Sequence, residues 1–145
     1  MEFACRKRKT VMIVETPDAP KKRSHGSPEG KIQAECFAWF WNKYPHYRKL
    51  LFHVPNENDR ADSNIIQGAI RKSLGVVAGV ADLLFLVARG DYHGLCIEMK
   101  DEKGRQKPSQ KEWQEKVEKQ GYKYVVCRSL ESFKTEIEDY LWRSL

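Results

Sequence analysis

The most hydrophobic segment of the chain, GVADLLFLVARGDYHGLCIEMK at residues 79–100, is bounded by charged side chains. Its two apolar runs, LLFLVA and LCI, are separated by RGDYHG, a composition typical of a turn between two strands. Asp82 opens the first run, and Glu98 and Lys100 close the second. Unpaired buried charges are costly, so these three side chains must reach solvent, pair with one another or hold a cation. The segment therefore predicts a hydrophobic hairpin with a charged end.

Strand geometry predicts how these charges are arranged. Side chains alternate along a strand, so Glu98 and Lys100 are expected on one face and Met99 on the other. A turn centred at residues 90–91 would place Asp82 opposite Met99, between the rows of Glu98 and Lys100. Two carboxylates and one ammonium group would then gather at one end of the hairpin.

Such a cluster suits the hydrolysis of a phosphodiester. Carboxylate oxygens are hard ligands that favour magnesium or manganese over zinc. The metal would neutralise the phosphate and activate water, and the lysine would stabilise developing negative charge or orient the nucleophile. A second Glu-x-Lys triplet, Glu29-Gly30-Lys31, shows that the triplet also arises by chance. From the pattern alone, a nuclease and a plain salt bridge between Asp82 and Lys100 both remain open.

The rest of the chain predicts alternating helices and strands. Ser27 can cap a helix over residues 28–43, with Pro28 in its first turn and Glu29 at the positive end of its dipole. The further expected elements are a strand at 49–55, a polar loop at 56–64, helices at 63–75 and 108–120, a strand at 122–127 and a helix from 129 capped by Ser129. This order predicts an α/β fold with a mixed sheet flanked by helices.

Charge is distributed unevenly along the chain. Residues 1–26 contain seven basic and three acidic residues, whereas residues 27–145 are nearly balanced. We expect a flexible basic tail at 1–26, in which Lys21, Lys22 and Arg23 contact DNA, and one folded domain at 27–145. A solvated tail without a specific role is the alternative.

The composition also excludes several classes of protein. The four cysteines form no C-x-x-C pair, so neither a disulfide framework nor a zinc site is expected. No apolar stretch approaches the roughly 20 residues that span a bilayer, and the N-terminus lacks the pattern of a signal peptide. From these two absences we expect an intracellular, cytoplasmic protein. The sequence also has no P-loop or dinucleotide fingerprint, so we expect no small-molecule cofactor.

Three segments together resemble a known family: GVAD, GLCIEMKDEKGRQKPSQKEWQ and GYKYVVCRSLESF. Over about residues 27–142 the chain resembles the VRR-NUC family of the PD-(D/E)XK nuclease superfamily, in its stand-alone phage and bacterial form. The resemblance implies a restriction-endonuclease-like core, with magnesium or manganese bound by Asp82, Glu98 and the backbone carbonyl of Met99, and with Lys100 as the catalytic lysine. Ala81 stands where the superfamily name expects proline, a backbone position that should not affect metal binding.

The resemblance also implies a substrate and an assembly. Stand-alone members are similar to Holliday-junction resolvases and act as homodimers. We therefore expect a structure-specific endonuclease for branched DNA, with four-way junctions as the favoured substrate, acting as a homodimer in a bacterial or phage-infected cell. The alternatives are a DNA-binding module without catalysis and a PD-(D/E)XK nuclease of flap or restriction-type specificity.

The first helix is expected to add a further side chain to the site. PEGKIQAEC resembles the family's E-x-x-I-Q start, which points to Glu29, also as a metal ligand, and to Gln33. These two lie on one helical face, whereas Glu35 is on a different face and is the weaker candidate. The alternative for Glu29 is a first-turn acid that only favours the helix dipole.

Three further residues are candidates from the resemblance. Gln110, in the first turn of the helix after Lys100, is expected to face the site and hold a water or phosphate. A surface glutamine is the alternative. Asn56 and Arg60, in the polar loop, are expected to contact the DNA backbone.

Overall fold

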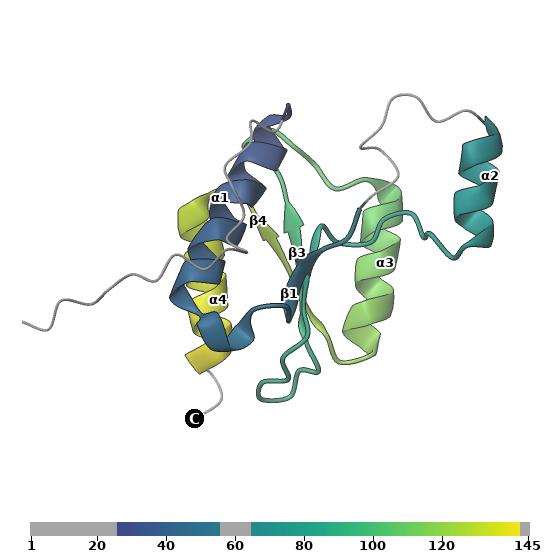
Figure 1. Cartoon of the computed structure of the whole chain (residues 1–145). Coiled ribbons are helices and arrows are strands. Elements are labelled where there is room, and N and C mark those ends of the chain that lie inside the picture. The colour runs from purple at the N-terminus through teal and green to yellow at the C-terminus, as the bar shows by residue number, and fades with distance from the viewer. Residues whose placement is uncertain (1–25, 56–64, 143–145) are drawn as a thin grey trace, which may run out of the picture.

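The computed structural model describes residues 26–55 and 65–142 (Figure 1). Its helices are α1 (Pro28–Lys43), η1 (a 3₁₀ turn, Pro45–Tyr47), α2 (Ile65–Ser73), α3 (Pro108–Lys119) and α4 (Leu130–Trp142). Its strands are β1 (Leu51–His53), β2 (Leu83–Phe85), β3 (Leu95–Met99) and β4 (Lys123–Cys127). They form one mixed sheet in the order β1-β2-β3-β4, in which only β3 and β4 pair in parallel. The predicted α/β class is confirmed.

The helix boundaries follow from local capping. Ser27 Oγ accepts the N–H of Gly30 at 3.0 Å, and α1 begins at Pro28 as predicted. Ser129 Oγ accepts the N–H of Ser132 at 3.1 Å, so the predicted cap of α4 is confirmed too. Both hydroxyls satisfy backbone donors that the first turn of a helix leaves without partners.

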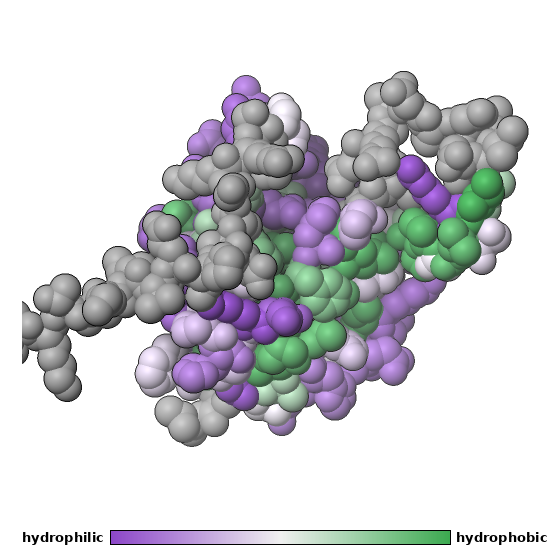
Figure 2. Space-filling model, in the orientation of Figure 1, coloured by the Kyte–Doolittle hydropathy of each residue, from purple (hydrophilic) through white to green (hydrophobic). Residues whose placement is uncertain are grey.

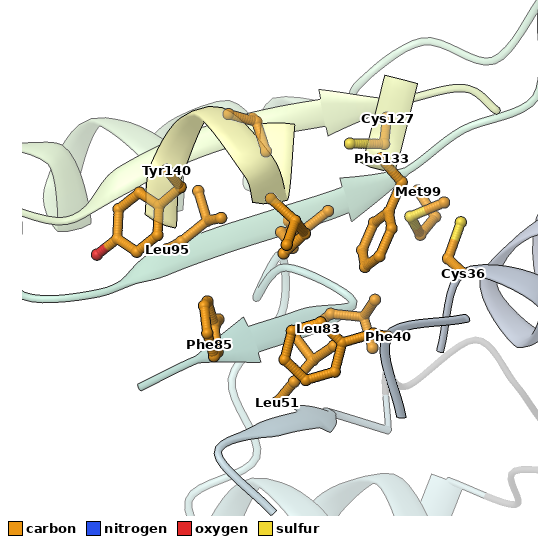
Figure 3. Packing of buried hydrophobic residues seen from close by; sticks show 13 residues of the cluster. Cys36, Phe40, Leu51, Leu83, Phe85, Leu95, Met99, Cys127, Phe133 and Tyr140 are labelled. Atoms are coloured by element: carbon orange, nitrogen blue, oxygen red, sulfur yellow. The ribbon is translucent and has the colours of Figure 1, made fainter. Parts of the chain in front are cut away.

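Helices cover both faces of the sheet. On one face, α1 and α4 pack over a large apolar core, whose labelled side chains Figure 3 shows between strands and helices. On the other face, α3 covers a smaller cluster built around Ala81, Cys96 and Tyr124. This two-sided cover explains why β3 is buried along its whole length.

The turn between β2 and β3 forms where the sequence predicts it. The N–H groups of Arg89 and Tyr92 each donate to the other's carbonyl at 2.9 Å, which closes the turn around residues 90–91. Between this turn and the sheet, however, residues 86–88 follow β2 whereas only residues 93–94 precede β3, so the β2 side has one residue more. An extra residue in one arm shifts the register, as a β-bulge does.

The register shift moves Asp82 by one position. Leu83 pairs with Ile97, so the expectation that Asp82 lies directly opposite Met99 is wrong by one residue. Asp82 nevertheless contacts that strand, because its Oδ2 accepts the N–H of Met99 at 2.8 Å. The N–H of Val54 in turn donates to the carbonyl of Asp82 at 2.9 Å. The residue before β2 is thus held from both neighbouring strands.

The three cysteines that the structure describes are buried and free. Burial raises the pKa of the Cys36 and Cys127 thiols to about 12 and that of Cys96 to about 11. They pack as small core residues, as the sequence predicts, and Cys5 lies outside the described residues.

Part of the surface is apolar. Phe52 is exposed on β1, Leu50 directly before β1 and Leu86 directly after β2, and Leu74 and Val77 are exposed after α2. Figure 2 shows hydrophobic surface gathered over the middle of the face in view.

Nowhere in residues 26–55 and 65–142 is a helix both long and apolar enough to cross a membrane.

Candidate active site

Glu98 is the centre of the polar cluster. It is the penultimate residue of β3 and is fully buried on the face that α3 covers. Its Oε1 accepts a hydrogen bond from Gln110 Nε2 and lies 2.7 Å from Lys100 Nζ. Its Oε2 accepts a longer hydrogen bond, 3.4 Å, from the Tyr124 hydroxyl. The protein therefore holds this carboxylate from three directions.

Lys100 directly follows β3 and shares the face of Glu98. Its side chain is 8% exposed, and its Nζ also lies 4.0 Å from Glu29 Oε1 on α1. Glu29 is itself 40% exposed, so it stands at the solvent edge of the cluster. The structure thus brings together Glu98, Lys100 and Glu29, as the sequence predicts.

The electrostatics of Glu98 reflect two unfavourable effects. Burial and, after it, the nearby charge of Asp82 raise the pKa of Glu98, and Lys100 and Tyr124 oppose the shift, so that the pKa stands at about 7. For Lys100, burial alone would lower the pKa, but contact with Glu98, followed by the charges of Glu29 and Asp82, raises it overall. The lysine therefore stays charged, and the buried carboxylate lacks full compensation.

Gln110 faces this cluster from the first turn of α3. Its Nε2 donates to Glu98, and its Oε1 accepts the N–H of Lys107 at 2.8 Å. One amide thereby caps α3 and holds the carboxylate at the same time. Gln110 is 7% exposed, which rules out the alternative of a surface glutamine.

Gln33 borders the cluster through a histidine. Its Nε2 lies 2.9 Å from Nδ1 of His53 on β1, and the same nitrogen lies 2.9 Å from the carbonyl oxygen of Asp82. Because a carbonyl only accepts, Nδ1 donates to Asp82 when it carries the proton and accepts from Gln33 when it does not. Glu35 is exposed on α1, on a different face from Gln33.

Five predicted DNA-binding residues lie outside the described residues. They are Lys21, Lys22 and Arg23 of the basic tail and Asn56 and Arg60 of the polar loop. Their roles stay predictions, as does the domain boundary after residue 26. Of the predicted DNA contacts, only Lys100 lies in the described part of the chain.

Sequence reasoning missed the roles of His53 and Tyr124. His53 reads as an ordinary residue at a strand end, because its partners come from distant parts of the chain. Tyr124 could have been found from alternation: it pairs with Cys96 in the parallel register, so it shares the face of Glu98 two residues further along.

The donors fit a hard divalent cation held mainly by carboxylates. Asp82 and Glu98 would supply the oxygen ligands, and the repulsion between them is what such a cation would relieve. Within the described residues, no three or more His, Cys, Asp or Glu side chains form a metal-binding group. Magnesium commonly takes only one or two carboxylates and keeps several waters, so a pair is sufficient for it but not for structural zinc.

Comparisons with known proteins point to one family. The family model of the VRR-NUC domain matches residues 27–131. A solved structure described as a VRR_NUC domain protein is 30% identical and superposes with a TM-score of 0.62, covering 81% of this chain and 90% of its own. No curated protein matches the sequence. The fold is accordingly restriction-endonuclease-like, and the domain is of nuclease type with DNA as its substrate. This chain belongs to the VRR-NUC family.

Proposed function

We propose that this protein is a magnesium- or manganese-dependent endodeoxyribonuclease whose active centre is formed by Asp82, Glu98 and Lys100. One observation carries the proposal: the fully buried carboxylate of Glu98 on β3 lies 2.7 Å from the ammonium group of Lys100 and is repelled by the charge of Asp82. A fold stabilised only by salt bridges gains little from this arrangement, because burying charge costs more than pairing returns. An active centre that binds a metal and a phosphate does require such charges, because the carboxylates then bind the metal and the lysine binds the phosphate.

Each residue has a distinct part in the proposed reaction. The metal, held by Asp82, Glu98 and the carbonyl of Met99, would supply charge neutralisation and a more acidic water. Lys100, charged and close to Glu98, would stabilise negative charge that develops on the phosphate. Gln110 fixes the rotamer of Glu98, and Glu29 at the solvent edge would orient a water or a second ligand.

The proposed substrate is branched DNA, with the four-way junction as the favoured form. Support comes from the resemblance to resolvase-like stand-alone members of the family. A four-way junction has two-fold symmetry, so a homodimer with one centre in each subunit would match it. The exposed apolar side chains of Phe52 on β1 and of Leu50 and Leu86 beside β1 and β2 support a dimer, because such surface commonly marks an interface.

A DNA-binding module without catalysis is the second candidate. One observation favours it: both carboxylate oxygens of Glu98 already have hydrogen-bond partners within the protein. In that case the cluster would only stabilise the end of the sheet. A nuclease of flap or restriction-type specificity is a variant of the first proposal and differs from it only in substrate.

A substrate panel tests the proposal. The full chain is incubated with a four-way junction, a flap, a nicked duplex and a linear duplex, each in magnesium, in manganese and in EDTA. We expect metal-dependent cleavage, fastest on the junction, and a dimer by analytical ultracentrifugation. Binding without cleavage of any substrate in either metal would support the module instead. Faster cleavage of the flap or linear duplex would correct the specificity alone.

A further inference from the structure

The loop between β3 and α3, residues 101–107, is unusually well anchored for a surface connection. Asp101 Oδ1 accepts the N–H groups of Lys103 at 3.0 Å and Gly104 at 2.5 Å, which closes a tight turn directly after Lys100. Arg128, from the start of the next connection, donates from Nη1 to the carbonyls of Asp101 at 2.5 Å and Gly104 at 2.8 Å. The loop is therefore fixed from within and by the residue that follows β4.

The same loop packs directly on the proposed active centre. A Cβ atom on Gly104 would lie 3.0 Å from Asp101 Oδ1, 3.1 Å from Glu29 Oε1 and 3.1 Å from Lys100 Cδ. A larger residue at this position would therefore require the side chains of Asp101, Glu29 and Lys100 to shift by a few tenths of an ångström. In Figure 1 this connection crosses the end of the molecule where α1 begins and then enters α3.

Further along, the loop stays attached to α3. Gln106 Nε2 donates to Gln114 Oε1 at 2.9 Å, and Lys107 N–H donates to Gln110 Oε1 at 2.8 Å. The anchoring contacts thus come from Asp101, Gly104 and Gln106 and from the Lys107 backbone, leaving the side chains between them outside these contacts.

Those remaining side chains are mainly cations. Lys103, Arg105 and Lys107 are all exposed, and Glu102 is the exposed acid of the loop. The first turn of α3 contains no acidic residue, so its positive dipole end adds to the same potential. Cations on an ordered backbone bind phosphates with little loss of backbone conformational entropy, because only their side chains have still to be ordered.

We propose that loop 101–107 binds the DNA phosphate backbone beside the site of cleavage, through Lys103, Arg105 and Lys107, independently of base sequence. The inference rests on the proposed function, since it names the surface by which that same site holds its substrate. It assigns the electrostatic contact to the folded domain itself, whereas the sequence pointed to the tail and the loop at 56–64.

The test is the salt dependence of binding, measured in EDTA so that cleavage does not interfere. A fluorescently labelled four-way junction and a linear duplex are titrated with the full chain between about 50 and 200 mM salt. The variant K103A/R105A is compared with K116A/K119A, which removes the same charge from the last turn of α3. Because α3 spans roughly 18 Å, which is longer than the screening length of about 10 Å at 0.1 M salt, charges in its last turn are largely screened from DNA bound at the loop.

We expect K103A/R105A to reduce the slope of log K against log salt by about 1.8 and to weaken binding tenfold or more at about 0.1 M salt. Both DNA forms should lose affinity, and K116A/K119A should behave as wild type. Equal slopes for the two double variants, with matching melting temperatures, would overturn the inference. Because binding is measured without cleavage, the two proposals can fail separately. A wild-type protein that binds DNA but never cleaves it would contradict the proposed nuclease activity without contradicting the role of the loop in DNA binding.

Discussion

At the scale of single residues, the charge of Asp82 affects the protonation of Glu98. Burial and the charge of Asp82 both raise the pKa of Glu98, so the metal-free protein keeps a proton there that the unfolded chain has lost. The bound proton therefore stabilises the folded protein fully below about pH 4.5, and this stabilisation is lost as the pH rises through about 7. A cation bound to the two carboxylates would compensate their charges and so restore the stability that is lost.

Replacing Asp82 with asparagine tests this coupling. The amide oxygen can still accept the N–H of Met99, but the repelling charge is gone, so the pKa of Glu98 should fall. Each unit of that fall is worth about 1.4 kcal/mol. We expect D82N to gain stability over wild type as the pH rises from 5 to 8, measured by thermal melting in EDTA. A difference between the two proteins that does not change with pH would contradict the coupling.

His53 is expected to act as a positioning residue for Asp82. Its Nδ1 contacts both the Asp82 carbonyl and Gln33, so removing the ring should loosen the residue that precedes β2. We expect H53A to lower kcat by roughly fivefold, the value of one hydrogen bond of about 1 kcal/mol, with little change in KM. H53N places a polar atom where Nδ1 lies and should restore most of the rate. Equal kcat values for H53A and H53N would show that the hydrogen bond is not what matters.

At the scale of elements, the site depends on how closely α3 approaches the loop before β2. Gly79 has φ +83° in that loop, and a Cβ atom there would lie 2.3 Å from the carbonyl oxygen of Ser109. This contact with the first turn of α3 fixes the distance between Gln110 and the sheet. Gly75 has a similar φ of +87° but open space around it.

These two glycines form a matched pair for a stability experiment. G75A should cost about 1–2 kcal/mol, because only the backbone conformation is strained. G79A should cost at least about 1 kcal/mol more, because the backbone of α3 must also move. Urea unfolding of the two variants measures the difference. Equal destabilisation would mean that the close contact at Ser109 contributes nothing to the fold.

The elements also show where sequence reasoning succeeds and where it stops. The hairpin turn at residues 90–91 is local, so its composition is enough to predict it. The register is not local, because it depends on which residues of β2 and β3 pair and not on the turn alone. The extra residue before Arg89 shifts that pairing by one position and so moves Asp82 relative to Met99. Alternation still predicts the shared face of Glu98 and Lys100, because one strand end carries both residues.

At the scale of the whole molecule, the order of helices and strands predicts the α/β class, but not which distant side chains meet. Nothing in the sequence alone places Arg128 on the backbone of Gly104, or Gln33 on His53. Such contacts depend on how α1, β4 and the loops pack around the sheet. Of the candidate residues from the family resemblance, Glu98, Lys100, Glu29 and Gln110 meet, and Gln33 only borders them through His53. Their chemical roles need experiment.

The most direct test of the central claim is cleavage of a four-way junction by E98Q in magnesium. Glutamine keeps the size of the buried side chain and an acceptor for Lys100, so the fold and DNA binding should persist. The control is E115Q, because Glu115 is exposed on α3. We predict that E98Q loses at least about 100-fold in single-turnover rate, as expected for loss of a metal ligand's charge, with unchanged binding, whereas E115Q cleaves as wild type does. Cleavage by E98Q at the rate of wild type would contradict the claim that this carboxylate is part of the active centre.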